Sequence, residues 1–208
     1  MSLVSRLQPQ FPTLERQRDA DHFGMLIFLT TEVLIFGGLF AALFVLRAEH
    51  SAEYVKSSKD MHYWLGGINT AVLLTSSAIV ALTVEAVKAG AAQLAKWLLL
   101  AAIALGLGFL AIKFTEYALE YRDGVVPLLS AAKLHEGPDT LFMDLYFAAT
   151  GLHALHVTAG LLLLGSLIWP FGRARHDTSA VFAGNAALYW HLVDVIWVFL
   201  YPTLYLAR

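Results

Sequence analysis

Cysteine is absent from this 208-residue chain, and charged residues are scarce. Without thiols the chain has no disulfide, thiol nucleophile, cysteine-ligated iron–sulfur cluster, c-type haem attachment or thiolate copper site. Asp, Glu, Lys and Arg make up 14% of the residues, whereas soluble domains carry about 25%. The formal net charge of -2 offers no basic footprint for nucleic acid. The scarcity of charge indicates that most of the surface does not face water.

Long apolar segments dominate instead, giving 58% hydrophobic residues and a mean hydropathy of +0.64. Five of them stand out, at residues 25–46, 64–87, 94–118, 141–169 and 185–207. Each would form roughly 33–44 Å of helix, enough to cross a hydrocarbon core of about 30 Å. A soluble bundle would instead have to bury nearly every helix on all faces. We therefore predict an all-α membrane protein: a polar N-terminal segment, 1–24, followed by a domain of five transmembrane helices, 25–208.

The connections between these segments fit antiparallel helices. Residues 88–93 are a short link, which predicts a tight hairpin of the second and third helices, and Pro170–Asp177 form a polar break. The two longer loops, 47–63 and 119–140, fall on the same side by the odd–even count. No signal peptide is evident, because the first apolar run exceeds the 7–15 residues of a signal h-region.

Charge on the two sides bears on orientation. The side of the N-terminus carries seven basic residues, Arg6, Arg16, Arg18, Lys88, Lys96, Arg173 and Arg175. The other side carries six, Arg47, Lys56, Lys59, Arg122, Lys133 and Arg208. This slight excess favours a cytoplasmic N-terminus. The longer loops hold the acids Glu49, Glu53, Asp60, Glu120, Asp123, Glu136 and Asp139, which form either a solvated face or an attractive surface for a basic soluble partner.

Ionisable residues inside the spans are the candidates for function, because a charge at membrane depth costs several kcal/mol unless it is paired or hydrated. Glu32 lies inside the first span, where a carboxyl could bind a proton, hold a lipid or join a neighbouring helix. Lys113 and Glu116 are three apart and could pair on one helix face, although we expect Lys113 to snorkel to the interface instead. Asp144 could assist the start of the fourth helix.

The histidines allow two interpretations. His153 and His156 are three apart in the fourth span, and His191 precedes Asp194 by three in the fifth, so each pair shares a helix face. Histidines from two helices could clamp a haem, as in membrane di-haem cytochromes. Alternatively they join an interhelical polar network with Thr150, Thr158 or Tyr189. Spacing alone leaves both open.

Several motifs resemble subunit III of haem–copper terminal oxidases, in the order of that family. They are TEVLIFGGLF at 31–40, NTAVLLTSS at 69–77, Glu116-Tyr117, ATGLHALHVTAG at 149–160 and YWHLVDVIW at 189–197. The resemblance covers roughly residues 24–208, and the last two motifs together are highly specific. It implies the subunit III helical bundle with a cytoplasmic N-terminus, in a short five-helix bacterial form. On this resemblance we expect the chain to lack the two N-terminal helices of the long, seven-helix form.

The resemblance also implies an accessory role in a cytochrome c oxidase of the bacterial inner membrane. Such a subunit belongs to a proton-translocating oxidoreductase but is not catalytic by itself. It carries no redox centre and no metal, binds phospholipid, and supports proton uptake and stability of its partners. Those partners are subunit I, which holds haem and copper, and subunit II, with cytochrome c possible on the outer face. Glu32 then matches the family's intramembrane carboxylate, and His153, His156, His191, Asp194 and Glu116 become residues of a polar network or lipid contact.

Other functions stay open at this point. The same role in a quinol oxidase fits nearly as well, since other subunits determine the electron donor, and a homologue associated with nitric oxide reductase would look similar. A membrane b-type cytochrome and a proton-coupled carrier that uses Glu32 are alternatives of different classes.

Overall fold

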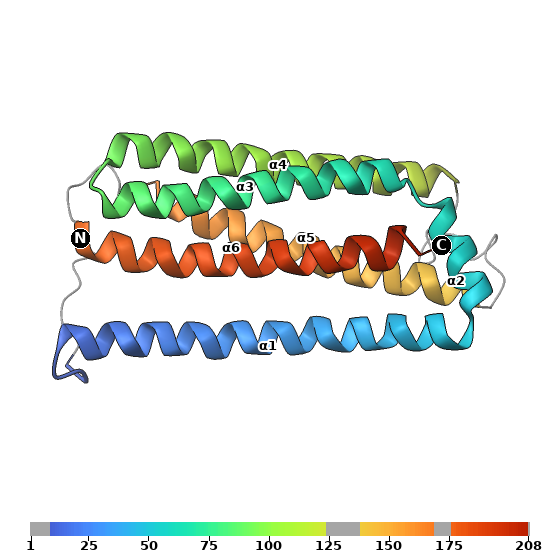
Figure 1. Ribbon diagram of the computed structural model, residues 1–208, viewed down its shortest axis with the longest axis horizontal. Helices are drawn as coiled ribbons and strands as arrows, with labels where there is room; N and C mark the ends of the chain where they lie inside the picture. Colours follow the sequence, from blue (N-terminus) through green and yellow to red (C-terminus); the bar gives the residue numbers. More distant parts are fainter. Residues whose placement is uncertain (1–8, 124–137, 169–175, 208) are drawn as a thin grey trace.

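The computed structural model describes residues 9–123, 138–168 and 176–207. Regular structure in these residues is entirely α-helical. The helices are α1 (Leu14–Glu49), α2 (Ser51–Asp60), α3 (Tyr63–Lys88), α4 (Ala92–Asp123), α5 (Pro138–Ser166) and α6 (His176–Tyr205). The five long helices run side by side along the long axis of the molecule, and α2 lies at one end of them (Figure 1).

Five helices, α1, α3, α4, α5 and α6, are long and apolar enough to cross a membrane. The predicted all-α architecture with five transmembrane helices is therefore confirmed. Even α3, with 26 residues, spans about 39 Å against a hydrocarbon core of about 30 Å. Each helix thus reaches beyond the hydrocarbon at one or both ends.

The helices are longer than the apolar segments from which we predicted them. Helix α1 begins at Leu14, where the Thr13 hydroxyl accepts a hydrogen bond from the Arg16 N–H at 3.3 Å. Helix α6 begins at His176 and α4 runs on to Asp123. Helical hydrogen bonds need no apolar side chains, so hydropathy marks only the part of a helix that lies in lipid. Most of the predicted break at 170–177 and loop at 119–140 lies outside the described residues.

Helix α2 occupies a segment that we expected to be a loop. Its sequence is short and polar, so it contains no apolar run from which a helix could be predicted. Its inner side nevertheless holds the buried Tyr54. The Tyr54 hydroxyl donates to the Thr203 carbonyl at 2.8 Å, and its ring meets Phe142 edge-on at 4.9 Å. Burial raises the pKa of Tyr54 to about 12, although the Arg47 guanidinium acts in the opposite direction. Through Tyr54, α2 ties the end of α6 to the start of α5.

The turn between α3 and α4 depends on Gly90. This residue has φ 75°, a left-handed conformation that glycine adopts without steric cost. The Gly90 N–H donates to the Val87 carbonyl at 3.0 Å and the Ala91 N–H to the Ala86 carbonyl at 2.9 Å, which is the Schellman pattern of helix ends. The predicted tight hairpin of these two helices is confirmed.

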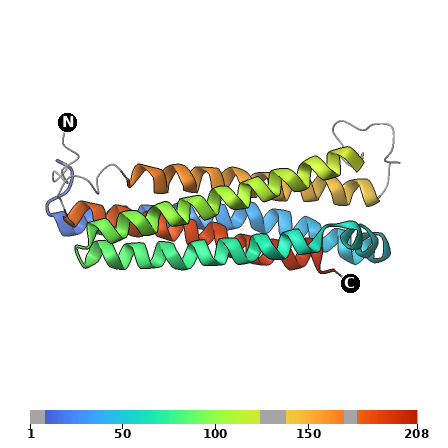
Figure 2. The same ribbon diagram turned by 90° about the horizontal axis from the view of Figure 1, so that it is seen from above.

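The hairpin of α3 and α4 forms one side of the bundle. Helix α6 packs against α3 and α5, and α4 also meets α5. Helix α1 packs against α5, α6 and α2 and lies at the edge of the bundle, below the other helices in Figure 1 and behind them in Figure 2. Because α1 has fewer helical neighbours than α6, one of its faces is left to the surroundings of the protein.

The core between α4, α5 and α6 is built around Trp190. A Cβ atom on Gly106 would lie 2.8 Å from the Trp190 ring, and one on Gly160 would lie 2.7 Å from it. Both distances are well inside van der Waals contact. The two glycines therefore provide the space in which the indole of α6 is 1% exposed.

We predict that Gly106→Ala destabilises the protein, whereas Gly108→Ala on the same helix does not. Both changes gain about 1 kcal/mol of helix propensity, but nothing lies within 4 Å of a Cβ on Gly108. The Gly106 variant must displace Trp190, and overpacking of this kind costs about 1–3 kcal/mol. Thermal unfolding in detergent, followed by tryptophan fluorescence, measures the difference. Equal melting temperatures for the two variants would contradict this packing.

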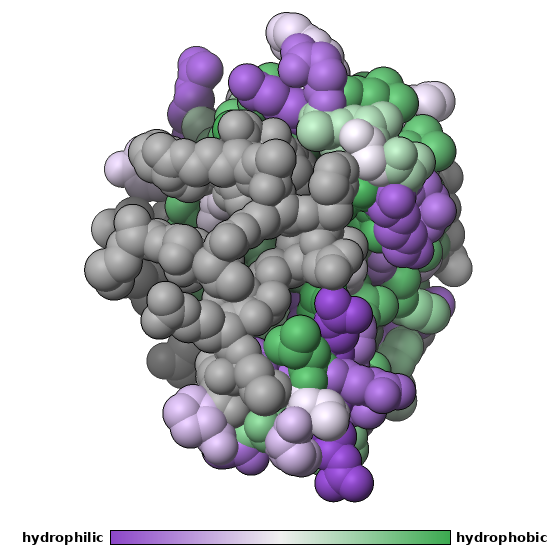
Figure 3. All heavy atoms as spheres, turned by 90° about the vertical axis from the view of Figure 1, so that its left-hand side faces the viewer, coloured by the Kyte–Doolittle hydropathy of each residue, from purple (hydrophilic) through white to green (hydrophobic). Residues whose placement is uncertain are grey.

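The outward faces of the long helices are covered with large hydrophobic side chains. Leu34 of α1 is 70% exposed and Leu162 of α5 is 72% exposed, and apolar surface of this extent is unusual in water-soluble monomers. Figure 3 looks onto the end that carries the start of α1 and shows hydrophilic side chains gathered around it. Apolar sides with a polar end are the surface expected of a protein embedded in lipid.

Candidate functional site

Polar side chains meet inside the bundle at three places. The Glu32–His156 pair joins α1 to α5. The lysine cluster consists of Lys113, Glu116, Tyr146 and Tyr205, from α4, α5 and α6. The serine–histidine group consists of Ser77 on α3 with His191 and Asp194 on α6.

The Glu32–His156 pair is a short contact within the membrane-spanning part. Nε2 of His156 lies 2.6 Å from a carboxyl oxygen of Glu32, and both side chains are about one-tenth exposed. Nδ1 of His156 lies 2.8 Å from the Leu152 carbonyl oxygen. A carbonyl only accepts, so Nδ1 must carry a proton and donate it to this bond. The Tyr189 hydroxyl donates to the His156 carbonyl at 3.3 Å and supports the same turn.

The number of protons in this pair follows from the geometry. With Nδ1 protonated, the contact between Nε2 and Glu32 needs exactly one more proton, on either the ring or the carboxyl. A carboxylate with an imidazolium and a carboxylic acid with a neutral imidazole both sum to zero charge. Glu32 therefore lies in the membrane as half of a neutral pair, which avoids the cost of an isolated charge.

The lysine cluster is a closed hydrogen-bond network. The Lys113 ammonium donates to Glu116 at 2.9 Å, Tyr146 at 2.9 Å and Tyr205 at 2.6 Å, which uses all three of its donors. Each tyrosine hydroxyl donates in turn to the other oxygen of Glu116, at 3.0 and 2.7 Å. We expected Lys113 to snorkel, and that was wrong. It is 1% exposed because these partners replace water around the ammonium.

Aromatic rings complete the surroundings of Lys113. Its ammonium lies 4.7 Å from the Tyr146 ring centroid, 5.1 Å from Tyr117 and 5.4 Å from both Trp197 and Tyr205. Each is within the about 6 Å at which a cation is attracted by a ring face. The cluster thus connects α4, α5 and α6 through one buried ion pair.

The serine–histidine group lies between α3 and α6. The Ser77 hydroxyl is 2.6 Å from Nδ1 of His191 and is also a hydrogen-bond partner of Asp194. Asp194 is 5% exposed, and its Oδ1 has no hydrogen-bond partner. His191 and Asp194 thus meet at a shared serine, which the sequence motif contained but to which we gave no role.

His153 stands apart from the other histidines. Its side chain is 0% exposed, and neither ring nitrogen has a hydrogen-bond partner. Phe36, Phe109 and Trp197 surround it, with ring centroids at 6.5, 5.6 and 5.0 Å. Within the described part of the chain, no three His, Cys, Asp or Glu side chains are grouped so as to hold a metal ion.

The remaining candidates lie in simpler surroundings. Asp144 is exposed and lies beyond the first turn of α5, which begins earlier, at Pro138, than the apolar segment suggests. Thr158 donates to the Ala154 carbonyl of its own helix at 2.8 Å, whereas Thr150 bonds Tyr117 across the bundle at 2.6 Å. Glu120, which we counted among the acids of a loop, is only 3% exposed on α4.

The tyrosines of the lysine cluster were missed by sequence reasoning. Tyr146, Thr150 and His153 follow one another at helical spacing on α5, and all three are 0% exposed. A stripe of polar residues along an apolar helix is therefore a signal that would have found Tyr146. Tyr205 carries no comparable signal, because the residues one and two turns before it, Tyr201 and Trp197, are aromatic and do not point to a buried ion pair.

The family model of cytochrome c oxidase subunit III matches residues 15–207. The chain belongs to this family. It is 34% identical to cytochrome c oxidase subunit 3 of Thermostichus vulcanus over 187 residues, covering 88% of this chain and 85% of the relative. It is also 34% identical to the protein of that name from Synechocystis over 192 residues, covering 90% and 76%.

A relative with a different name has a similar identity to this chain. Cytochrome bo(3) ubiquinol oxidase subunit 3 of Pseudomonas aeruginosa is 30% identical over 191 residues, covering 88% of this chain and 83% of the relative. The resemblance to subunit III of haem–copper oxidases is thus confirmed for nearly the whole chain. Family membership and the five apolar spans together show that this chain is a multi-pass membrane protein and a subunit of the respiratory oxidase type.

Proposed function

We propose that the chain is an accessory subunit of a terminal haem–copper oxidase and carries no redox centre of its own. It packs beside subunits I and II, of which subunit I holds the haems and copper. Membership of the subunit III family carries this proposal. The internal polar contacts agree with it, because the Glu32–His156 pair and the lysine cluster bind helix to helix within the bundle.

Helix α1 offers a surface for such packing and for lipid. Its inner face buries Glu32, Phe36, Leu43 and Leu46, while the opposite face is apolar and exposed. With few helical neighbours, α1 is stabilised by whatever covers that face in the membrane. A partner helix or phospholipid there would explain how this subunit stabilises the catalytic subunit and its proton uptake.

The membrane is the bacterial inner membrane, with the N-terminus in the cytoplasm. The slight basic excess on the side of the N-terminus supports this orientation. Helix α2 and the C-terminal end of α6 then lie at the outer surface. Acidic residues at that end, among them the exposed Glu49 and Glu53, favour cytochrome c as the electron donor because it is a basic soluble partner.

Quinol is the second candidate donor. The relative from Pseudomonas aeruginosa is named as a subunit of a ubiquinol oxidase, and its identity to this chain is close to that of the cytochrome c oxidase subunits. The donor site belongs to other subunits of the complex. The isolated chain is therefore expected to be inactive with either donor.

Purification from native membranes in mild detergent tests the proposal. We expect a haem–copper subunit I and a subunit II to co-purify with this chain, together with phospholipid. Recovery of the chain without any haem–copper subunit would overturn the accessory role. A Soret band in the separated chain would favour the b-type cytochrome, and proton-coupled flux in proteoliposomes that Glu32→Gln abolishes would favour the carrier.

A further inference from the structure

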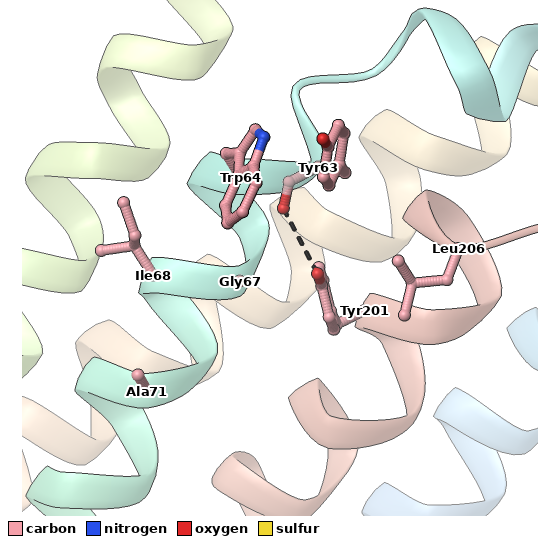
Figure 4. Close-up of a pocket in the computed structure, with 7 residues that line it drawn as sticks. All are labelled: Tyr63, Trp64, Gly67, Ile68, Ala71, Tyr201 and Leu206. Carbon is pink, nitrogen blue, oxygen red and sulfur yellow. Dashed lines mark hydrogen bonds between the residues drawn. The ribbon is translucent and has the colours of Figure 1, made fainter.

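An open apolar groove lies between the start of α3 and the end of α6. Its volume is about 520 Å³, and it is lined by Tyr63, Trp64, Gly67, Ile68, Ala71, Tyr201 and Leu206. Figure 4 shows side chains of α3 along one side, and Tyr201 of α6 with Leu206, which follows α6, along the other. The volume falls in the range of about 300–1,000 Å³ typical of small-molecule sites.

Glycines and one hydrogen bond shape this groove before any ligand arrives. A Cβ on Gly66 would lie 2.8 Å from the Tyr201 ring, and one on Gly67 would lie 3.2 Å from its hydroxyl. The Tyr201 hydroxyl donates to the Tyr63 carbonyl at 3.3 Å (Figure 4). Tyr201 is thereby held close to the backbone of α3, and its ring forms a wall of the groove.

The position of the groove along α3 places it at the edge of the hydrocarbon. Helix α3 is about 9 Å longer than a hydrocarbon core of about 30 Å, so a centred helix extends about three residues beyond each boundary. Trp64, 71% exposed, then lies at the interface, where tryptophan is enriched. Ile68 and Ala71 lie about 6 and 10 Å further along the helix, at the depth of acyl chains.

A cationic residue precedes the groove on the polar side. Lys59, in the last turn of α2, is exposed. Lys59 is four residues from Tyr63, so its Cα lies at most about 15 Å from the first lining residue. A lysine within this distance can attract the phosphate of a lipid at the membrane surface beside the groove.

We propose that this groove binds one phospholipid, with an acyl chain against Ile68, Ala71 and Tyr201 and the phosphate near Lys59. The apolar lining matches the acyl chain, the aromatic residues at the boundary match the interfacial region of the lipid, and Lys59 matches the phosphate. The inference deepens the proposed function, because it names a site and a class of lipid for a lipid-binding accessory subunit. A transmembrane helix of a partner would need no cation at this position.

Photo-crosslinking in the purified complex tests the occupant. A phosphatidylglycerol with a diazirine in one acyl chain is incorporated, irradiated, and its adducts are mapped by mass spectrometry. We expect adducts within residues 63–71, and we expect Ala71→Phe to reduce them severalfold by filling the groove. Ala104→Phe is the matched control, because Ala104 is also an exposed alanine of a membrane-spanning helix but lies outside the groove.

The headgroup contact is tested with Lys59→Gln. A lysine near a membrane surface contributes about 1 kcal/mol to the attraction of anionic lipid, so adducts of the phosphatidylglycerol probe should fall about fivefold. Adducts of a phosphatidylcholine probe should change less. Lys88→Gln at the opposite end of α3 serves as the control and should change neither.

Two results would overturn the site. One is a set of adducts in 63–71 that Ala71→Phe leaves unchanged, and the other is crosslinking of this segment to a partner subunit in place of lipid. The same probe applied to the chain alone in lipid nanodiscs separates this inference from the accessory role. Lipid adducts at residues 63–71 in the nanodiscs would support the groove by themselves. If no oxidase subunit then co-purified from native membranes, only the accessory role would be removed.

Discussion

Lys113→Met should lower the stability of the protein by about 3–5 kcal/mol, the cost of breaking a buried ion pair by removing one partner. Glu116 is 0% exposed, so without the ammonium it must either stay buried as an unpaired carboxylate or take up a proton, and both cost free energy. The hydroxyls of Tyr146 and Tyr205 would still donate to it but would lose the lysine donor that they both accept from. Thermal unfolding of the purified chain or complex measures this loss.

Two further variants make the result specific to burial. Lys88 and Glu85 form the same i, i+3 pair at 2.7 Å, but with side chains 58% and 68% exposed, so Lys88→Met should have little effect. Replacing Lys113 and Glu116 together with methionine should recover most of the loss, because no uncompensated charge remains. Equal stability of Lys113→Met and wild type would show that the lysine cluster is not an ion pair.

His156→Phe should increase the reaction of Glu32 with a hydrophobic carbodiimide by about tenfold or more. In the wild type the Glu32 carboxyl shares its proton with Nε2 of His156 at 2.6 Å. Hydrogen bonds to charged groups contribute about 1.5–3 kcal/mol, and 1.4 kcal/mol corresponds to a tenfold change in population. Without the ring, Glu32 keeps its own proton, since an isolated carboxylate in hydrocarbon is costly, and it becomes free to react.

Peptide mapping of the labelled chain measures this effect. Glu32→Gln should abolish the label, which assigns it to the carboxyl. His153→Phe is the matched control: this histidine lies one turn away on the same helix and has no hydrogen bond to Glu32. An unchanged rate in His156→Phe, or an equal increase in His153→Phe, would refute the proton-sharing pair.

Relations within a single helix were predictable from the sequence. The spacing of Lys113 and Glu116 predicted that they could pair, because residues three apart on a helix are neighbours. The same spacing placed His191 and Asp194 on one face, and the structure brings both to Ser77. What spacing did not reveal was the third partner in each case, which comes from another helix.

Contacts between helices depended on the packing. Glu32 and His156 are separated by 124 positions, and Lys113 and Tyr205 by 92. Such pairs form only when the rotation and the axial offset of two helices agree. Our expectation that Lys113 would snorkel failed for this reason. The apolar segment ends soon after Lys113, but α4 continues to Asp123, and the neighbouring helices supply Tyr146 and Tyr205.

The sequence by itself determined that this chain has five transmembrane helices, carries ionisable residues at membrane depth and shares the motifs of the subunit III family. These features depend on composition and on the 3.6-residue period, which are properties of each segment alone. The tertiary structure decided how Glu32 is neutralised, why Lys113 stays buried, that α2 exists and that α3 and α6 enclose an apolar groove. Each of these depends on side chains that contact one another across helices. Polar contacts of this kind stabilise the bundle strongly, because no water is present in the membrane interior to hydrogen-bond the same groups.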